Sequence, residues 1–231
     1  MPHVAADVRF QPASDQSLLL YLGEKITLDV HQQIVKLLRL LTSEPINGIR
    51  NLHPAYCSVL IQFDPFILDH ERLTNVLSEY LNLLREIPLP DSREVEIQVC
   101  YGGEFGPDLD AVAALHEISA AQVIELHSSA TYIVYFLGFT PGFAYLGGLP
   151  ESLETPRLPT PRRKVLEGSV GIAGNQAGVY SFPTPGGWRL LGCTPEAMFR
   201  PDREHMCLLS IGDRVRFVPI SEEEFRARRQ A

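Results

Sequence analysis

The stretch that decides the fold of this chain is FLGFTPGFAYLGGL at 136–149, TPRLPTPRRKV at 155–165 and EGSVGIAGNQAGVYSFPTPGGW at 167–188. Glycine and proline separate short apolar segments throughout it, which is typical of β-strands joined by tight turns. Each glycine inside a regular element costs roughly 0.5–1 kcal/mol relative to alanine, so stability alone does not explain their number. We therefore expect a closed or sandwiched β structure whose loops carry exposed polar groups.

The second half of the chain repeats this pattern of short apolar segments between glycine and proline clusters. Strands are expected at residues 132–137, 169–173, 179–182, 188–191, 206–210 and 214–218. Two short helices are expected before them, at 108–117 and 119–127, because each opens with an acidic or hydroxyl residue suited to N-capping. The pattern favours a β-rich second domain over residues 96–231.

The first half combines strand-like segments with helical periodicity. Strands are expected at residues 17–22, 46–53, 57–64 and 95–100, and helices at 28–41 and 73–84. Thr27 is a suitable N-cap for the first helix, and Pro45 ends it. The order strand, helix, strand, strand, helix, strand is ferredoxin-like. The predicted fold class is therefore α+β, with a ferredoxin-like split βαβ domain in residues 1–95.

The composition limits the classes of function. The formal net charge is −8, whereas nucleic-acid binding normally needs a basic face, so no nucleic-acid partner is expected. No apolar run approaches the ~18 residues of a membrane span, and residues 1–10 lack the pattern of a signal peptide. We expect no membrane association and a cytoplasmic location. The histidines and the four cysteines lack metal-ligand spacing, so no metal site is expected, and the cysteines are expected to be small buried hydrophobic residues.

A basic segment with three prolines lies between the two glycine-rich motifs. It carries Arg157, Arg162, Arg163 and Lys164. Proline stiffens the backbone, so arginines on it lose less entropy on binding an anion, and guanidinium groups match carboxylate or phosphate with paired hydrogen bonds. The segment is interpreted as an anion clamp, with a solvated basic loop as the alternative.

The segment GSVGIAGNQAGVY at 168–180 offers exposed backbone N–H groups and two side-chain amides. Asn175 and Gln176 can both donate and accept, which suits an amide or lactam whose C=O and N–H need opposite partners. The alternative is a set of tight barrel turns, and Tyr145, Tyr180 and Trp188 are either pocket walls or core aromatics. Neither a phosphate-binding Walker loop nor a nucleophile elbow is present, so we expect no covalent catalysis by this chain alone.

These motifs, with CYGGEFGPDLDAVA at 100–113 and GDRVRFVPI at 212–220, resemble the family once labelled allophanate hydrolase subunit 1. That family includes the B subunit of bacterial ATP-dependent 5-oxoprolinase and the sporulation-kinase inhibitor KipI. The resemblance runs from about Ser17 to Ile220 and is most specific from Tyr101 to Trp188. It implies an N-terminal ferredoxin-like domain and a C-terminal cyclophilin-like β-barrel.

The resemblance also implies an activity and partners. The family's reaction converts 5-oxo-L-proline, ATP and water into L-glutamate, ADP and phosphate, so the chain would be one subunit of an amidohydrolase and inactive alone. The implied partners are a PxpC-like C subunit and a PxpA-like A subunit, and the cofactor is ATP with Mg²⁺, bound here or at a partner subunit. Two alternatives follow from the same resemblance: a KipI-like inhibitor of a histidine kinase, and a carboxyltransferase component that acts on urea or a related amide.

Residues at matching motif positions form the candidate site. The catalytic candidates are Arg157, Arg162, Asn175 and Gln176, expected to stabilise charge that develops on the phosphoryl group and the carbonyl. The candidate substrate-binding residues are Phe139, Gly142, Tyr145, Gly174, Tyr180 and Trp188. The chain departs from the family at Ala144, where relatives usually have proline, and at 166–168, where they often have Pro-Ala-Gly.

Overall fold

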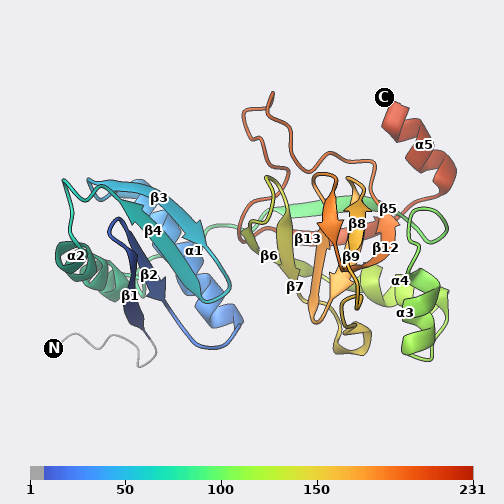
Figure 1. Ribbon diagram of the computed structural model, residues 1–231, viewed down its shortest axis with the longest axis horizontal. Coiled ribbons are helices and arrows are strands. Elements are labelled where there is room, and N and C mark those ends of the chain that lie inside the picture. The colour runs from blue at the N-terminus through green and yellow to red at the C-terminus, as the bar shows by residue number, and fades with distance from the viewer. Residues whose placement is uncertain (1–7, 231) are drawn as a thin grey trace. The chain divides into compact units, whose positions relative to one another are not determined.

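The computed structural model describes residues 8–230 (Figure 1). Within it the chain divides into two compact units, with the boundary between Asp91 and Ser92. The first unit contains a four-stranded sheet with two helices, and the second contains a closed β-barrel. The fold class is therefore mixed α and β. The expected absence of a signal peptide rests on residues 1–10, most of which lie outside the described residues.

The first unit is an antiparallel sheet in the order β1-β2-β4-β3. Its elements are β1 (Arg9–Ser14), β2 (Ser17–Tyr21), α1 (Leu28–Ser43), β3 (Ile49–Pro54), β4 (Ser58–Phe63) and α2 (His70–Leu83). Both β2 and β3 run antiparallel to β4, so they are parallel to each other with β4 between them and α1 connecting them. This arrangement is a split βαβ unit.

The helices of this unit follow from capping and periodicity. The hydroxyl of Thr27 accepts a hydrogen bond from the Val30 N–H at 3.3 Å, and the Asp69 carboxylate accepts one from the Arg72 N–H at 2.8 Å. These bonds satisfy N–H groups that the first turn of a helix leaves without a partner. The apolar faces of α1 and α2 are buried on the sheet.

One strand of the first unit differs from the sequence prediction. The segment 95–100 was expected to complete the sheet, but it lies in the second unit as part of β5 (Glu94–Tyr101), and β1 occupies the edge beside β2. The hairpin from β1 to β2 closes through Ser14 and Ser17, whose hydroxyl oxygens are 2.7 Å apart. Because the turn between β1 and β2 is so short, β1 is closer in sequence to the free edge of β2 than the segment 95–100 is.

Seven strands of the second unit close into a barrel, in the order β10-β7-β6-β13-β5-β12-β9 (Figure 1). Their bounds are β5, given above, β6 (Tyr132–Leu137), β7 (Ala144–Gly147), β9 (Ser169–Ala173), β10 (Gln176–Val179), β12 (Arg189–Cys193) and β13 (Arg214–Pro219). An odd number of strands cannot alternate in direction all round a closed barrel. The one parallel pair is β5 with β13, and the other six neighbouring pairs are antiparallel.

The remaining elements lie around this barrel. They are α3 (Leu109–Leu115), α4 (Ala120–Ser129), the short 3-10 helix η1 (Glu151–Leu153), the paired strands β8 (Arg162–Val165) and β11 (Thr184–Gly186), and α5 (Glu222–Gln230). β8 and β11 form a separate two-stranded sheet. None of the described helices is both long and apolar enough to cross a membrane.

The strand predictions for the second half are confirmed in part. Residues 132–137 and 169–173 coincide with β6 and β9. The prediction for 179–182 is wrong because the strand begins directly after the turn at 174–175 and ends at Val179. The prediction for 206–210 is also wrong, since that segment folds back on its own loop through an isolated bridge between Phe199 and Cys207.

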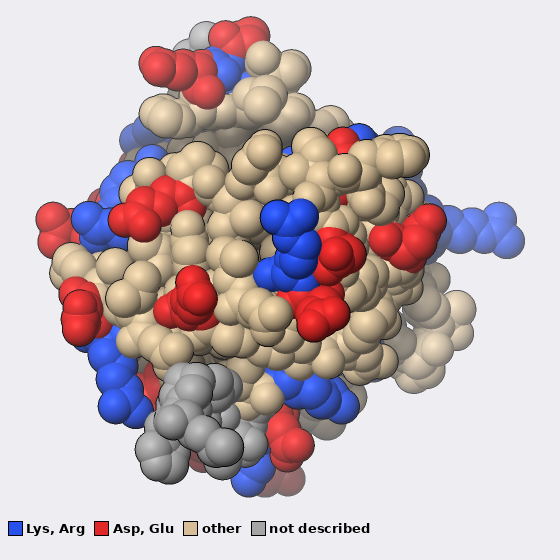
Figure 2. All heavy atoms as spheres, turned by 90° about the vertical axis from the view of Figure 1, so that its left-hand side faces the viewer, with Lys and Arg blue, Asp and Glu red and all other residues tan. Residues whose placement is uncertain are grey.

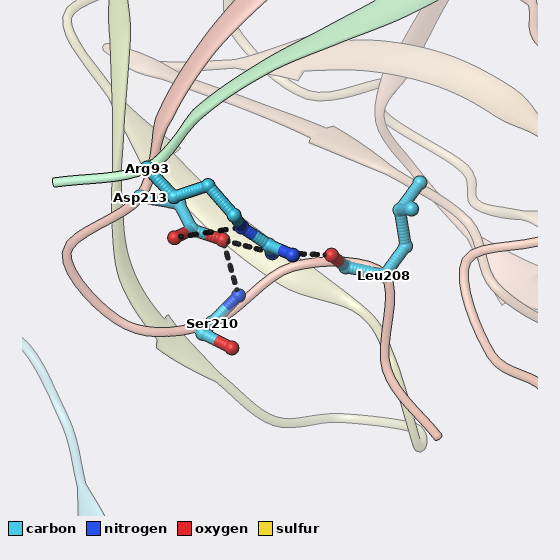
Figure 3. A network of polar contacts seen from close by, with 4 residues as sticks. All are labelled: Arg93, Leu208, Ser210 and Asp213. Carbon is cyan, nitrogen blue, oxygen red and sulfur yellow. Dashed lines mark hydrogen bonds and ion pairs between the residues drawn. The ribbon is translucent and has the colours of Figure 1, made fainter. Parts of the chain in front are cut away.

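Side chains tie the ends of the barrel together. At the start of β5, Arg93 donates to Asp213 at 2.5 Å and to the carbonyl oxygen of Leu208 at 2.6 Å (Figure 3). The same Asp213 carboxylate accepts the Ser210 N–H at 2.7 Å. At the other end, Phe225 of α5 is buried against Cys100 and Cys193. The four cysteines are free, and these two act as small buried hydrophobic residues.

One fully buried histidine, His127 of α4, packs against the barrel strands β5 and β13. The His127 ring is stacked on Phe217 with centroids 4.5 Å apart, and its Nδ1 lies 2.7 Å from the Tyr101 hydroxyl oxygen. Among the described residues its Nε2 has no hydrogen-bond partner. Burial lowers the pKa of His127 to about 3 because the charged ring would lose its hydration.

This buried histidine predicts acid sensitivity of the barrel. An unfolded histidine takes up a proton near pH 6.5, while folded His127 stays neutral, so stability is retained above pH 6.5 and lost as the pH falls toward 3. Between these values the free energy of unfolding should fall by up to about 1.4 kcal/mol per pH unit from this group. Urea titrations at pH 7 and 5, followed by fluorescence of Trp188, the single tryptophan, measure the slope.

His127→Phe should reduce this slope, whereas the exposed His205→Gln should leave it unchanged. An unchanged slope in His127→Phe would show that the ring is not kept neutral in the folded barrel.

Candidate functional site

An aromatic cluster lies on the wall of the barrel, with Phe143 at its centre. The Phe143 ring makes edge contacts with Phe139, Tyr145, Tyr180 and Trp188, at centroid distances of 5.5, 5.0, 5.4 and 5.6 Å. These residues come from the loop before β7, from β7 itself, and from the segments beside β11. Four of the six predicted substrate-binding residues are therefore brought together, around a phenylalanine that the sequence prediction did not assign.

Two glycines of the motif let Trp188 pack against this wall. A Cβ atom built on Gly178 of β10 would lie 3.0 Å from Cζ3 of Trp188, and one on Gly171 of β9 would lie 3.3 Å from its Cβ. Contacts this short are tighter than ordinary packing allows, so a larger residue would displace the indole. At these two positions the glycines serve close packing rather than ligand approach.

The cluster has a buried floor and an exposed edge. Trp188 and Tyr180 are buried, at 6% and 3% exposure, while Phe139 is 60% exposed. Phe139 has a φ of +67°, a left-handed conformation that a bulky residue adopts only where its surroundings enforce it. A hydrogen bond from the Gly138 N–H to the Phe143 carbonyl at 3.0 Å closes this loop, and a Cβ on Gly142 would lie 2.8 Å from the carbonyl oxygen of Met198.

Arg162 is held by a buried carboxylate. Its Nη2 donates to Oδ1 of Asp108 at 2.6 Å, and its Nη1 donates to the carbonyl oxygen of Trp188 at 3.4 Å. The other oxygen of Asp108, which is 6% exposed, accepts the N–H of Leu190 at 2.7 Å. Arg162 therefore fastens β8 to the barrel strand β12 and to the backbone of the aromatic floor. A catalytic role for Arg162 stays a prediction, and the contacts make it a positioning residue.

Arg157 is the available cation beside the cluster. It is exposed, and among the described residues its guanidinium forms no hydrogen bond or ion pair. Burial raises the pKa values of Tyr145 and Tyr180, and the positive charge of Arg157 acts in the opposite direction on both phenols. The charge of Arg157 therefore acts on both phenols, of which Tyr145 is half-buried and Tyr180 is buried.

The predicted amide residues, Asn175 and Gln176, lie at the turn of the β9–β10 hairpin. Gly174, with a φ of +55°, and Asn175 form the two-residue turn between β9 and β10, and Gln176 begins β10. Five residues of extended strand, ~17 Å, separate Asn175 from Tyr180. The structure therefore does not place Asn175 among the aromatic residues.

The segment 155–158 is anchored at two points, the turn of the β9–β10 hairpin and the residue before Trp188. The N–H of Gly174 donates to the Thr155 carbonyl at 2.7 Å, and the N–H of Leu158 donates to the Gly187 carbonyl at 2.7 Å. Arg157 lies between these two anchor points. Its backbone is therefore held at both sides, although its side chain is exposed.

The charges described at the site are carried by side chains of this chain. Within residues 8–230 no three or more His, Cys, Asp or Glu side chains gather in a way that could hold a metal ion. On the face drawn in Figure 2, Lys and Arg side chains are interspersed with Asp and Glu, without a continuous basic area.

Two residues of the site were missed by the sequence prediction. Asp108 lies in the quoted motif CYGGEFGPDLDAVA, yet its partner Arg162 is 54 positions away, and spacing alone does not pair them. Phe143 lies in the quoted motif FLGFTPGFAYLGGL between two assigned residues. An aromatic in the middle of a glycine-rich motif was the signal that could have identified it.

Comparisons with known proteins agree on one family. Residues 8–209 match the family described as carboxyltransferase domain, subdomain C and D. The chain is 39% identical to a Bacillus subtilis (strain 168) protein named as the B subunit of 5-oxoprolinase, over 95% of this chain and 97% of that protein. It is 25% identical to the urea amidolyase of Lachancea kluyveri, over 96% of this chain but 14% of that protein.

Solved structures show the same fold. The crystal structure of TTHA0988 matches with a TM-score of 0.79 and 37% identity, over 90% of this chain. This chain spans 40% of the TTHA0988 chain, so the matched protein contains a further portion that has no counterpart here.

The contrast between the two arginines gives a testable prediction. Arg162→Ala should lower the free energy of unfolding by about 2–3 kcal/mol, because it leaves the buried Asp108 carboxylate without its cation. Arg157→Ala should change it by less than about 0.5 kcal/mol, because its side chain is exposed and unpaired. Urea unfolding followed by Trp188 fluorescence measures both. Equal stability of the two variants would contradict the assigned roles.

Proposed function

The chain belongs to the family of carboxyltransferase domains, subdomains C and D, and from this premise we propose that it is the B subunit of an ATP-dependent 5-oxoprolinase. In this role it would contribute to the cleavage of 5-oxo-L-proline to L-glutamate with hydrolysis of ATP, in a complex with partner subunits. Three relatives that are named as B subunits of 5-oxoprolinase support this proposal.

The observation that carries the proposal is the unpaired Arg157 beside the aromatic cluster. A five-membered lactam with a carboxylate presents an apolar ring and one negative charge. The exposed Phe139 ring and the half-buried Tyr145 ring suit the ring atoms, and Arg157 suits the carboxylate. Arg162 would keep the floor beneath the ligand fixed through Asp108 and the Trp188 carbonyl.

The proposed chemistry needs fixed positive charge. Amide resonance makes a lactam a poor electrophile, and phosphorylation of its oxygen gives an intermediate that water can attack. Negative charge then develops on the phosphoryl group and on the former carbonyl. In this proposal Arg157 would bind the carboxylate of the lactam and so hold the amide in position for this step, while Asn175 and Gln176 at the hairpin turn could serve only a ligand group that extends toward that end.

ATP and Mg²⁺ are bound elsewhere in the complex in this proposal. We assign the nucleotide and its metal ion to the A or C subunit, and no step is assigned to them on this chain.

Exposed apolar side chains beside the site suit closure by a second polypeptide. Phe139 is 60% exposed and Phe182 is 37% exposed. Their neighbours Thr140 and Ser181 are joined by a hydrogen bond of 2.9 Å between their hydroxyl oxygens, so the two rings flank one point of the surface. Grouped exposed aromatics are typical of an interaction site. A C-type subunit that covers them would also exclude water from the site.

A second candidate function is a carboxyltransferase component that acts on urea or a related amide. It is favoured by the similarity to urea amidolyase over nearly the whole of this chain. The two candidates differ in cofactor, because a carboxyltransferase needs a partner that carries biotin.

Reconstitution of the chain with the A and C subunits encoded in the same genome tests the proposal. The complete mixture should release ADP and glutamate only when 5-oxoproline is added, and mixtures that lack one component should not. Arg157→Ala should lower kcat/KM for the lactam at least ~10-fold, the effect expected when a charged hydrogen bond is lost. Arg163→Ala, an exposed arginine on β8, is the matched control and should stay within about twofold.

ATP hydrolysis that is independent of the lactam would contradict the proposal. Activity on urea that requires a biotin-carrying partner would favour the second candidate instead.

A further inference from the structure

A second pocket lies on the outer side of the barrel wall, at β5. Its volume is about 420 Å³, within the range typical of small-molecule sites. Gln98 of β5 faces it, because the flanking residues Ile97 and Val99 point into the barrel core and successive side chains on a strand alternate. β5 is separated from β10 by β12 and β9 on one side and by three strands on the other. The pocket is therefore distinct from the aromatic site.

Three arginines line this pocket. Arg200 and Arg203 come from the long loop between β12 and β13, and Arg228 comes from α5. Among the described residues none of the three guanidinium groups has an ion-pair or hydrogen-bond partner. By contrast, Arg226 on the same helix pairs with Glu222 and Glu104. Three arginines without an ion-pair partner share this pocket with a single carboxylate, that of Glu196, so the lining carries a positive excess on a chain with a net charge of −8 and points to an anionic ligand.

Gln98 and Glu196 also line this pocket. The Glu196 carboxylate accepts the backbone N–H of Gln98 at 3.4 Å. Oε1 of Gln98 lacks a hydrogen-bond partner among the described residues, but it is inaccessible to solvent, so a ligand in the pocket would not reach it. The charged groups that a ligand can meet are therefore the three guanidinium groups and the Glu196 carboxyl group.

The pocket is preformed by well-anchored segments. The arginine-bearing loop is closed on itself by hydrogen bonds from the Arg200 N–H to the Met206 carbonyl at 2.7 Å and from the Leu208 N–H to the Met198 carbonyl at 2.9 Å. Its end is fixed by the bond from Arg93 to the Leu208 carbonyl (Figure 3). Binding to such a site requires little ordering of the backbone.

We propose that this pocket is a second binding site, which takes a small multivalent anion with phosphate or carboxylate groups through Arg200, Arg203 and Arg228. Arginine binds both kinds of group with paired hydrogen bonds, and three of them favour a ligand with at least two anionic groups. The inference does not depend on the proposed oxoprolinase activity, because every residue that it uses belongs to this chain.

Glu196 gives the site a dependence on pH. Burial raises the pKa of Glu196, while the hydrogen bond from Gln98 and the charge of Arg228 act in the opposite direction. The other charged groups around it are Arg200 and Arg203 of the same loop, and the loop's Asp202 and Glu204 are exposed. A bound anion would favour the protonated carboxyl group, which can then donate a hydrogen bond. For a ligand of constant charge, binding should therefore strengthen as the pH falls toward the raised pKa of Glu196.

Isothermal titration of the purified chain with pyrophosphate and with citrate tests the proposal. One ligand per chain should bind with a dissociation constant below about 1 mM at low salt, and more weakly at 200 mM salt. Arg203→Ala and Arg228→Ala should each weaken binding about 10-fold or more, whereas Arg226→Ala, the paired neighbour, should change it less than about twofold. Binding of pyrophosphate alone would assign the site to phosphates, and binding of citrate alone to carboxylates.

Glu196→Gln separates the role of the carboxylate from that of the arginines. The affinity of the Glu196→Gln variant is compared with that of the unaltered chain at each pH, so that the ligand's own ionisation cancels. The variant should bind the anion at least as tightly at pH 7.5, and its affinity should increase less on acidification. Urea unfolding confirms that each variant is folded. The proposal fails if neither anion saturates its site on the chain at concentrations below roughly 10 mM. It also fails if the Arg203→Ala and Arg228→Ala variants bind the anion as tightly as the unaltered chain does.

Discussion

The candidate site depends on one buried carboxylate. Asp108 is almost inaccessible to water, and both of its oxygens are engaged, since one accepts the N–H of Leu190 at 2.7 Å and the other binds Arg162 at 2.6 Å. A buried charge is tolerated only when it is paired and hydrogen-bonded. Asp108 therefore requires Arg162, and Arg162 holds the small β8–β11 sheet against the barrel. The Trp188 carbonyl joins the same arrangement, so the floor of the aromatic cluster is positioned by this ion pair.

Two of the three arginines of the TPRLPTPRRKV motif, Arg157 and Arg162, therefore have different roles. Arg162 is engaged inside the protein, whereas the exposed Arg157 lies beside the phenols of Tyr145 and Tyr180 and has no partner among the described residues. The backbone around Arg157 is anchored to the barrel at Thr155 and Leu158. The exposed Phe139 ring completes a surface that another polypeptide could cover. The geometry thus fits a component whose site becomes closed only in a complex.

Much of this fold could be predicted from local patterns. The strands at 132–137 and 169–173 and the Thr27 cap follow from short-range chemistry and are confirmed. β1 was missed because its residues, RFQPAS, are mostly exposed and show no apolar alternation. Four aromatic residues of the cluster were predicted from their motifs, but Phe143 and the pairing of Asp108 with Arg162 were not. Pairings over 54 positions depend on how the barrel closes, and no local pattern encodes that closure.

The account can be tested most directly with a double-mutant cycle of Asp108→Asn and Arg162→Gln. If the ion pair holds the β8–β11 sheet on the barrel, each single variant should be destabilised and the double variant should be little worse than either. The coupling energy from urea unfolding should then be about 2–3 kcal/mol, at the upper end of the range for contacting residues. Additive effects, with coupling below about 0.5 kcal/mol, would show that the pair does not support the site.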